Sequence, residues 1–201
     1  FMYSGDNLVQ VSSPSAPGAS ETRIWSYTYD DLGSLLTKTD PDGNATRYVY
    51  DENHRIREAV DPEGRIRTVA YDPVANTTRF TEKDGGVWVY AYDTNLGVLT
   101  EKTDPLGKTT RYEYDNRGNL TKKTEADGTF ASYTYDANDN VLTVTDPSGS
   151  VTAYAYNALH LVTSVTDARG KTTSYGYDPR GNLTLVTVPP EGSVTKVRFP
   201  L

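Results

Sequence analysis

Apolar and polar residues alternate along nearly the whole chain in short runs, and turn-forming residues separate these runs. Runs such as 109–114 and 120–124 are rich in Thr, Tyr and β-branched residues, a composition that favours strands. No stretch of useful length shows the three-to-four-residue spacing of an amphipathic helix. The pattern therefore predicts an all-β protein built from short strands.

Two turn signals alternate between these strands. The first turn follows a Tyr-Asp pair and carries Gly four residues after the Tyr, as at Gly33, Gly118 and Gly181. The second turn has the pattern Asp-Pro-x-Gly, as at 40–43. Asp accepts hydrogen bonds from the turn's own backbone, Pro presets the next φ, and Gly takes the positive φ at the end. Because short turns join antiparallel neighbours, we expect one β-hairpin per pair of turns and a long antiparallel meander.

The Tyr-Asp step recurs with a fixed period, which indicates a repeat architecture. Successive repeat tyrosines are 21, 21, 21, 22, 21, 21 and 21 residues apart. In most repeats a second Tyr stands two residues earlier, so both rings share one face of the strand. We expect these rings and an aliphatic residue six places after each repeat Tyr to form a ladder along the sheet. The predicted structural residues are Tyr29, Asp30, Tyr50, Asp51, Tyr71, Asp72, Tyr92, Asp93, Tyr112, Tyr114, Asp115, Gly118, Tyr133, Tyr135, Asp136, Tyr154, Tyr156, Tyr175, Tyr177, Asp178 and Gly181.

Two repeats depart from the pattern. The third has Val69, Ala75, Asn76 and Thr77 where the others have Tyr, Gly, Asn and Leu, and we expect it to be the weakest. The fourth has one extra residue within 96–99, which predicts a bulge or an enlarged turn.

The length suits a single domain spanning residues 1–201. Residues 1–28 are expected to be a degenerate first repeat, in which the Ser-, Pro- and Gly-rich stretch 12–20 forms a surface loop, or alternatively a domain linker. The regular repeats occupy 29–192, and 193–201 form a terminal strand. Since the first residue is not Met, we expect the chain to be a piece of a longer protein.

The pieces x-x-Gly-Asn-Leu, Asp-Pro-x-Gly and Tyr-x-Tyr-Asp, in this cyclic order and at this period, resemble Rhs/YD-repeat proteins. The resemblance covers Tyr27 to about Phe199. It implies a β-sheet that curls into a hollow shell. Such shells enclose a toxic C-terminal domain in bacterial Rhs toxins and insecticidal toxin complexes, and in teneurins the repeats form part of an extracellular adhesion receptor.

The resemblance also implies partners and a location. These are further YD repeats of the same parent protein and an enclosed C-terminal polypeptide, in a secreted or surface-displayed protein that a bacterium exports. The segment 104–107 is similar to a motif at which Rhs shells cut themselves, but further repeats follow it here. We therefore interpret this segment as an ordinary second turn.

Composition narrows the function classes. The apolar content is 36% and the mean hydropathy is −0.62, low values for a globule that suit a sheet with much wetted surface. A net charge of −7 disfavours nucleic acid and anionic membranes as partners. The chain has no Cys and therefore no disulfide or thiolate metal site. Its apolar runs are too short to span a bilayer, so we expect no membrane insertion.

Candidate chemistry is sparse. The two histidines, His54 and His160, stand in first turns about five repeats apart and are interpreted as turn residues. The segment 40–44 comes nearest to a calcium loop but lacks the downstream Glu of such loops. No catalytic or phosphate-binding motif is present. We therefore predict no metal, no cofactor and no enzymatic activity.

Two function hypotheses remain. The first is a structural shell segment that encloses a polypeptide. The alternative is an extracellular adhesion module that binds glycan or protein through exposed aromatics, with Trp25 and Trp88 as candidates because both break the repeat pattern. Evenly spaced aromatics favour the shell, whereas a binding surface would group them.

The terminal strand carries a further expectation. Within 193–199, the apolar residues Val194, Val197 and Phe199 make an edge that another chain can pair with. We expect edge-mediated self-association, which Val197→Lys would reduce.

Overall fold

The computed structural model describes residues 1–14 and 22–188, together with the backbone of 195–198. Secondary structure in these ranges consists of strands and turns without helices. The strands are β1 (Met2–Ser4), β2 (Asn7–Pro14), β3 (Thr22–Tyr29), β4 (Leu35–Thr39), β5 (Ala45–Tyr50), β6 (Ile56–Val60), β7 (Ile66–Asp72), β8 (Thr77–Thr81), β9 (Val87–Asp93), β10 (Val98–Thr103), β11 (Thr109–Tyr114), β12 (Leu120–Thr124), β13 (Phe130–Tyr135), β14 (Val141–Thr145), β15 (Val151–Tyr156), β16 (Val162–Thr166), β17 (Thr172–Tyr177), β18 (Leu183–Val188) and β19 (Thr195–Arg198).

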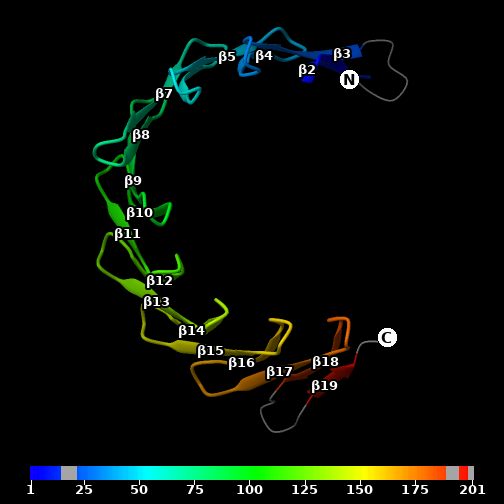
Figure 1. Cartoon of the computed structure of the whole chain (residues 1–201), viewed down its shortest axis with the longest axis vertical. Coiled ribbons are helices and arrows are strands. Elements are labelled where there is room, and N and C mark those ends of the chain that lie inside the picture. The colour runs from blue at the N-terminus through cyan, green and yellow to red at the C-terminus, as the bar shows by residue number, and fades with distance from the viewer. Residues whose placement is uncertain (15–21, 189–194, 199–201) are drawn as a thin grey trace. The chain divides into compact units, whose positions relative to one another are not determined.

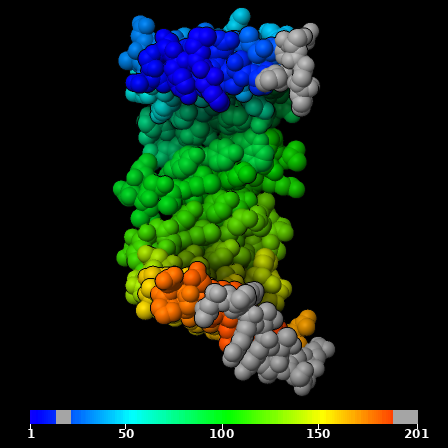
Figure 2. Space-filling view, turned by 90° about the vertical axis from the view of Figure 1, so that its right-hand side faces the viewer, coloured from blue at the N-terminus to red at the C-terminus, as the bar shows by residue number. Residues whose placement is uncertain are grey.

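The chain divides into two units. Unit 1 comprises Phe1–Ala91 and Thr103–Gly107, and unit 2 comprises Tyr92–Lys102 and Lys108–Leu201. In unit 1, each strand from β1 to β8 pairs antiparallel with the next. In unit 2, the same holds for each strand from β11 to β18. Within each unit the hairpins follow one another in chain order, as Figure 1 shows, and they form successive colour bands in Figure 2. The predicted all-β antiparallel meander is confirmed.

We number the repeats 1 to 8 by their repeat tyrosines. Each repeat tyrosine ends or nearly ends the first strand of its hairpin, from β3 in repeat 1 to β17 in repeat 8. The repeat tyrosines are Tyr29, Tyr50, Tyr71, Tyr92, Tyr114, Tyr135, Tyr156 and Tyr177.

The first and second turns have the same geometry. In repeat 5, the Asp115 amide donates to the Asn119 carbonyl at 2.9 Å, and the Gly118 amide donates to the Asp115 carbonyl at 3.1 Å. The Asp115 carboxylate accepts from the amides of Arg117 and Asn119, both at 2.9 Å. Asp146 accepts in the same pattern in a second turn. The recurring Asp is therefore explained by its own backbone, without a ligand.

A β-bulge accompanies the regular first turns. In repeat 5, Tyr114 lies opposite Leu120, but Glu113 lies opposite Lys122, so Thr121 is an extra residue. Repeats 1, 2, 6, 7 and 8 show the same register shift. The bulge brings the aliphatic residue directly opposite its own repeat tyrosine. Because every regular repeat contains the bulge, the 21-residue period does not reveal it.

The two ends of the chain differ in part from expectation. Strand β2 extends to Pro14, whose backbone partner is Thr22, so residues 12–14 belong to a strand and the loop begins later than predicted. In β1, Tyr3 lies opposite Leu8, which places Tyr3 where a repeat tyrosine would stand. Strand β19 pairs with β18, but residues 15–21, 189–194 and 199–201 and the side chains of β19 lie outside the described part of the chain. The predictions for Val194, Val197 and Phe199 therefore remain predictions.

The described side chains form no central core. None of the described side chains is fully buried. In β3, half-buried Tyr27 and Tyr29 alternate with exposed Ser26 and Thr28, so one face of the strand is better covered than the other. Neighbouring strands of the same layer supply that cover. Contacts from one repeat to the next must therefore hold the sheet together.

Candidate functional site

The repeat tyrosines bind the preceding repeat through their hydroxyl groups. The Tyr135 hydroxyl donates to the backbone carbonyl of Leu120, the aliphatic residue of the preceding hairpin, at 2.8 Å. We call this bond the tyrosine clamp. The described residues contain six clamps, from Tyr29 to Leu8, Tyr50 to Leu35, Tyr71 to Ile56, Tyr135 to Leu120, Tyr156 to Val141 and Tyr177 to Val162, with distances between 2.8 and 3.2 Å.

Each clamp ends at an irregularity in strand pairing. All six acceptor residues lie where the register of their hairpin shifts. A bulge leaves backbone groups without a ladder partner, and an unpaired carbonyl away from water is costly. The hydroxyl of the next repeat supplies a donor at this break. Tyr-Asp thus has two tasks: Tyr fastens the preceding repeat, and Asp closes its own turn.

The hydroxyls stay protonated over a wide pH range. Burial raises the pKa values of Tyr50, Tyr135 and Tyr156 above the ordinary value for tyrosine. These side chains therefore remain hydrogen-bond donors throughout the neutral range.

Repeat 3 lacks the regular turn and bulge. Its Tyr71 lies opposite Thr78 and Asp72 lies opposite Thr77, without a register shift. The positive φ falls on Asn76, four residues after Asp72, whereas it falls three residues after the Asp in regular repeats. The turn has absorbed the residue that elsewhere forms the bulge.

Repeat 4 has the same enlarged first turn. Its positive φ falls on Gly97, four residues after Asp93, and the Gly97 amide donates to the Asp93 carbonyl at 2.8 Å. The prediction of a bulge or enlarged turn from the extra residue is confirmed as an enlarged turn. Tyr114, which follows the enlarged turn of repeat 4, is half-buried and is not one of the six clamped tyrosines.

The two histidines occupy the first-turn position that has a positive φ and that is Gly in most regular repeats. Gly118 has a φ of 87°, as predicted. His54 and His160 occupy the same place in repeats 2 and 7 with φ of 57° and 60°, and Asp139 does so in repeat 6 with 64°. Aligning the repeats on their glycine column would have identified these three residues. His and Asp tolerate this conformation better than most residues do.

Side chains at this place reach the preceding repeat. Asp139 accepts from the Asn119 amide group at 2.7 Å and forms an ion pair with Arg117 at 2.8 Å. His160 Nδ1 lies 3.1 Å from Asn140 Oδ1. These contacts supplement the clamps along the first-turn edge. They form a structural ladder, and the two histidines belong to different units.

The turn carboxylates are held in their charged form. Hydrogen bonds within the turn, led by the Asn119 amide for Asp115 and by the Asn140 side chain for Asp136, hold the pKa values of these aspartates below the ordinary value. The pKa of Asp61 is lowered most strongly, because its carboxylate accepts from Lys83 as well as from Arg65. A carboxylate so engaged is a poor general acid or base at neutral pH.

The candidate binding tryptophans are not brought together. Trp25 in β3 lies opposite Val11, and Trp88 in β9 lies opposite Phe80. The guanidinium of Arg23 lies 5.8 Å from the centre of the Trp25 ring. Both tryptophans are half-buried among the side chains of their own hairpins. They continue the aromatic face of their repeats and do not form a shared patch.

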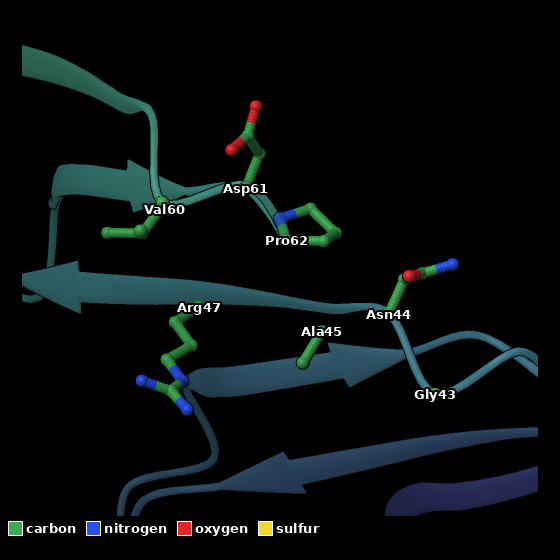
Figure 3. Close-up of a pocket in the computed structure, with 8 residues that line it drawn as sticks. Gly43, Asn44, Ala45, Arg47, Val60, Asp61 and Pro62 are labelled. Atoms are coloured by element: carbon green, nitrogen blue, oxygen red, sulfur yellow. The ribbon is translucent and has the colours of Figure 1, made fainter.

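Two shallow grooves lie between successive second turns. In unit 1, a groove of about 300 Å³ is lined by Asn44, Ala45, Arg47 and the segment 60–62, as Figure 3 shows. A second groove, of about 510 Å³, has the equivalent residues of repeats 6 and 7 at its walls. Because the groove occurs at equivalent places in two different pairs of repeats, we attribute it to the repeat architecture.

The described residues hold no group of three or more His, Cys, Asp or Glu side chains that could bind a metal ion. None of the described segments forms a helix with the length and apolarity that membrane crossing requires.

The period, the Asp-closed turns and the tyrosine clamps define a YD-repeat sheet. The chain belongs to the teneurin YD-shell family, whose profile matches residues 6–193. No curated protein matches the sequence.

Solved structures show the same fold. The crystal structure of TcdB2-TccC3-Cdc42 is similar with a TM-score of 0.61, and that of TcdB2-TccC3 with a TM-score of 0.60. Both are 17% identical in sequence, and each alignment covers 89% of this chain but only 13% of the other. The chain therefore corresponds to a small part of those much longer chains.

Proposed function

We propose that the chain is a structural, non-catalytic segment of a YD shell whose wall encloses a polypeptide, such as a toxin domain. The observation that carries this proposal is the way the sheet is held together. Its repeats are joined to one another by strand pairing and clamps, and none of the described side chains is fully buried. A sheet that is stabilised by contacts between successive repeats, without a buried core, is suited to form the wall of a shell.

Family membership supports the structural role, and the resemblance to Rhs and toxin-complex shells supports the enclosed polypeptide. The same proposal includes further YD repeats that continue the sheet on both sides. It also includes export from a bacterium to the outside or to the cell surface, because enclosed toxins act on other cells.

Protease protection of the parent protein tests this proposal. The complete reading frame around residues 1–201 would be expressed with a C-terminal epitope tag and digested with a nonspecific protease. We expect the C-terminal segment to resist digestion inside the intact protein and to be digested rapidly when expressed alone. Equal digestion rates would contradict enclosure.

The adhesion alternative makes a different prediction. A glycan or protein ligand that binds the isolated chain, and that no longer binds after Trp25→Ala or Trp88→Ala, would favour it. The separate positions of the two tryptophans give this alternative no grouped surface among the described residues.

A further inference from the structure

One arginine of unit 1 lines a groove without a counter-ion. Arg47 in β5 is exposed, and it lines the groove of about 300 Å³ between the second turns of repeats 1 and 2 (Figure 3). Its strand partners are Thr37 in β4 and Val60 in β6, and neither carries a charge. Among the described residues, no carboxylate forms an ion pair with its guanidinium. The positive charge is therefore available to a ligand in the groove.

The equivalent arginine of repeat 5 has a different environment. Arg111 in β11 stands three residues before its repeat tyrosine, as Arg47 does, and its Nε donates to the Glu101 carboxylate at 2.8 Å. Glu101 precedes Arg111 by ten residues, just as Thr37 precedes Arg47. At this repeat position, Arg111 thus has an acid as its neighbour, whereas Arg47 has an uncharged hydroxyl group.

The acids of the adjoining turns and strand already have partners. Four of them form ion pairs, which are Asp42 with Arg23 at 3.5 Å, Glu58 with Arg57 at 3.2 Å, and Asp61 and Glu63 with Arg65, both at 2.8 Å. A fifth acid, Asp40, accepts from two backbone amides of its own turn. Because the neighbouring negative charges are engaged in this way, Arg47 supplies the uncompensated charge of the groove.

The remaining walls of the groove are suited to a sugar ring. Ala45, Val60 and Pro62 provide an apolar wall. Asn44 donates through Nδ2 to Asp40 Oδ2 at 3.0 Å, which leaves its Oδ1 to accept from a ligand hydroxyl. A volume of about 300 Å³ is at the small end of ligand sites and suits a single sugar residue.

We propose that this groove binds a carboxylate-bearing sugar, namely a uronic acid residue of an acidic polysaccharide. The Arg47 guanidinium binds the carboxylate through two parallel hydrogen bonds, the geometry that arginine favours. The apolar wall contacts the ring, and Asn44 accepts from a hydroxyl. A peptide carboxylate would satisfy Arg47 but would bring no hydroxyl for Asn44. This site goes beyond the shell function and does not depend on what a shell encloses.

The second groove provides a matched site without the arginine. Ala153 in β15 takes the place of Arg47, and its strand partners are Thr143 and Thr166. Ser150 and Val151 stand where the first groove has Asn44 and Ala45. Introducing an arginine by Ala153→Arg should therefore create a second carboxylate site in unit 2.

Nuclear magnetic resonance titration of the isotope-labelled chain with sodium glucuronate tests the proposal. Because a single exposed charge pair contributes little, we expect a dissociation constant of about 1 mM, with shifts confined to amides near 43–47 and 60–64. Glucose has the same ring without the carboxylate and should bind about ten-fold more weakly. N-acetylglutamate, which represents a peptide carboxylate, should bind about five-fold more weakly than glucuronate.

Four variants complete the test. Arg47→Ala should weaken glucuronate binding about ten-fold and Arg47→Lys about five-fold, because lysine cannot form the paired hydrogen bonds. Arg111→Ala is the matched control and should leave binding unchanged, whereas Ala153→Arg should add shifts near 148–151 and 167–170.

Unchanged binding by Arg47→Ala, or equal binding of glucose and glucuronate, would overturn the proposal. Tighter binding of N-acetylglutamate than of glucuronate would assign the groove to peptide carboxylates and overturn the sugar. If Arg47→Ala does not fold, the comparison of Ala153→Arg with the unmodified chain still decides, since no new shifts in unit 2 would contradict the role given to arginine.

Discussion

Replacing Gly118 with Val should destabilise the sheet by a defined mechanism. Gly118 has a φ of 87°, and a Cβ placed there would meet no atom within 4 Å. The Cβ itself therefore meets no neighbour, and we expect the effect to come mainly from the backbone conformation. Holding a β-branched residue at this φ costs about 1–3 kcal/mol. The lower chain entropy of the unfolded variant offsets about 0.5–1 kcal/mol of that cost.

We therefore expect Gly118→Val to lower the free energy of unfolding by about 1 kcal/mol. Urea denaturation followed by far-UV circular dichroism measures it. Two controls isolate the backbone effect. Asn116→Val adds the same side chain at a turn position without positive φ, and Gly118→Asn adds a residue that tolerates it. If Gly118→Val and Asn116→Val unfold at the same urea concentration, the strain argument is wrong.

Four further predictions concern the turns, the clamps and the edge strand. Because the pKa values of Asp115 and Asp136 are lowered in the folded state, their contribution to stability is present above about pH 4 and is lost as the pH falls through the folded-state values. The melting temperature should therefore drop in acid. An unchanged melting temperature down to pH 2.5 would count against this. The raised tyrosine pKa values act in the opposite direction, and their contribution should be lost above about pH 10. His54→Gly should change the unfolding free energy by less than about 0.5 kcal/mol, because the relief of positive-φ strain and the greater entropy of Gly in the unfolded chain nearly cancel. A larger loss of stability, or loss of any binding activity, would show that His54 does more than occupy a turn. The exposed edge strand β1, with Met2 53% exposed, should support concentration-dependent association in sedimentation experiments, and Met2→Lys should reduce it; a monomer at every concentration would exclude this edge.

Much of the fold was predictable because the information is local. Asp-Pro-x-Gly and Tyr-Asp specify turns through their own backbone hydrogen bonds, and the strands between them have no other plausible partners than their neighbours. The positive φ at Gly118 followed from its turn position alone. The repeated period then made the antiparallel meander the simplest arrangement.

The clamps were harder to predict, because they depend on register. The tendency of Tyr to bury its ring and hydrogen-bond through its hydroxyl was expected, but the acceptor, in five of the six clamps a carbonyl 15 residues earlier, lies at the bulge. The bulge is itself hidden in the constant repeat length. Likewise, Tyr3 takes the place of a repeat tyrosine without the regular spacing, because its hairpin turn is one residue shorter than the regular one.

A cryo-electron microscopy structure of the complete parent protein tests the central claim most directly. The account predicts that residues 6–193 form consecutive β-hairpins in the wall of a hollow shell, with tyrosine hydroxyls on the carbonyls of preceding repeats and polypeptide density inside. A wall that encloses no polypeptide, or an assembly in which this sheet lies open to solvent on both faces, would contradict it.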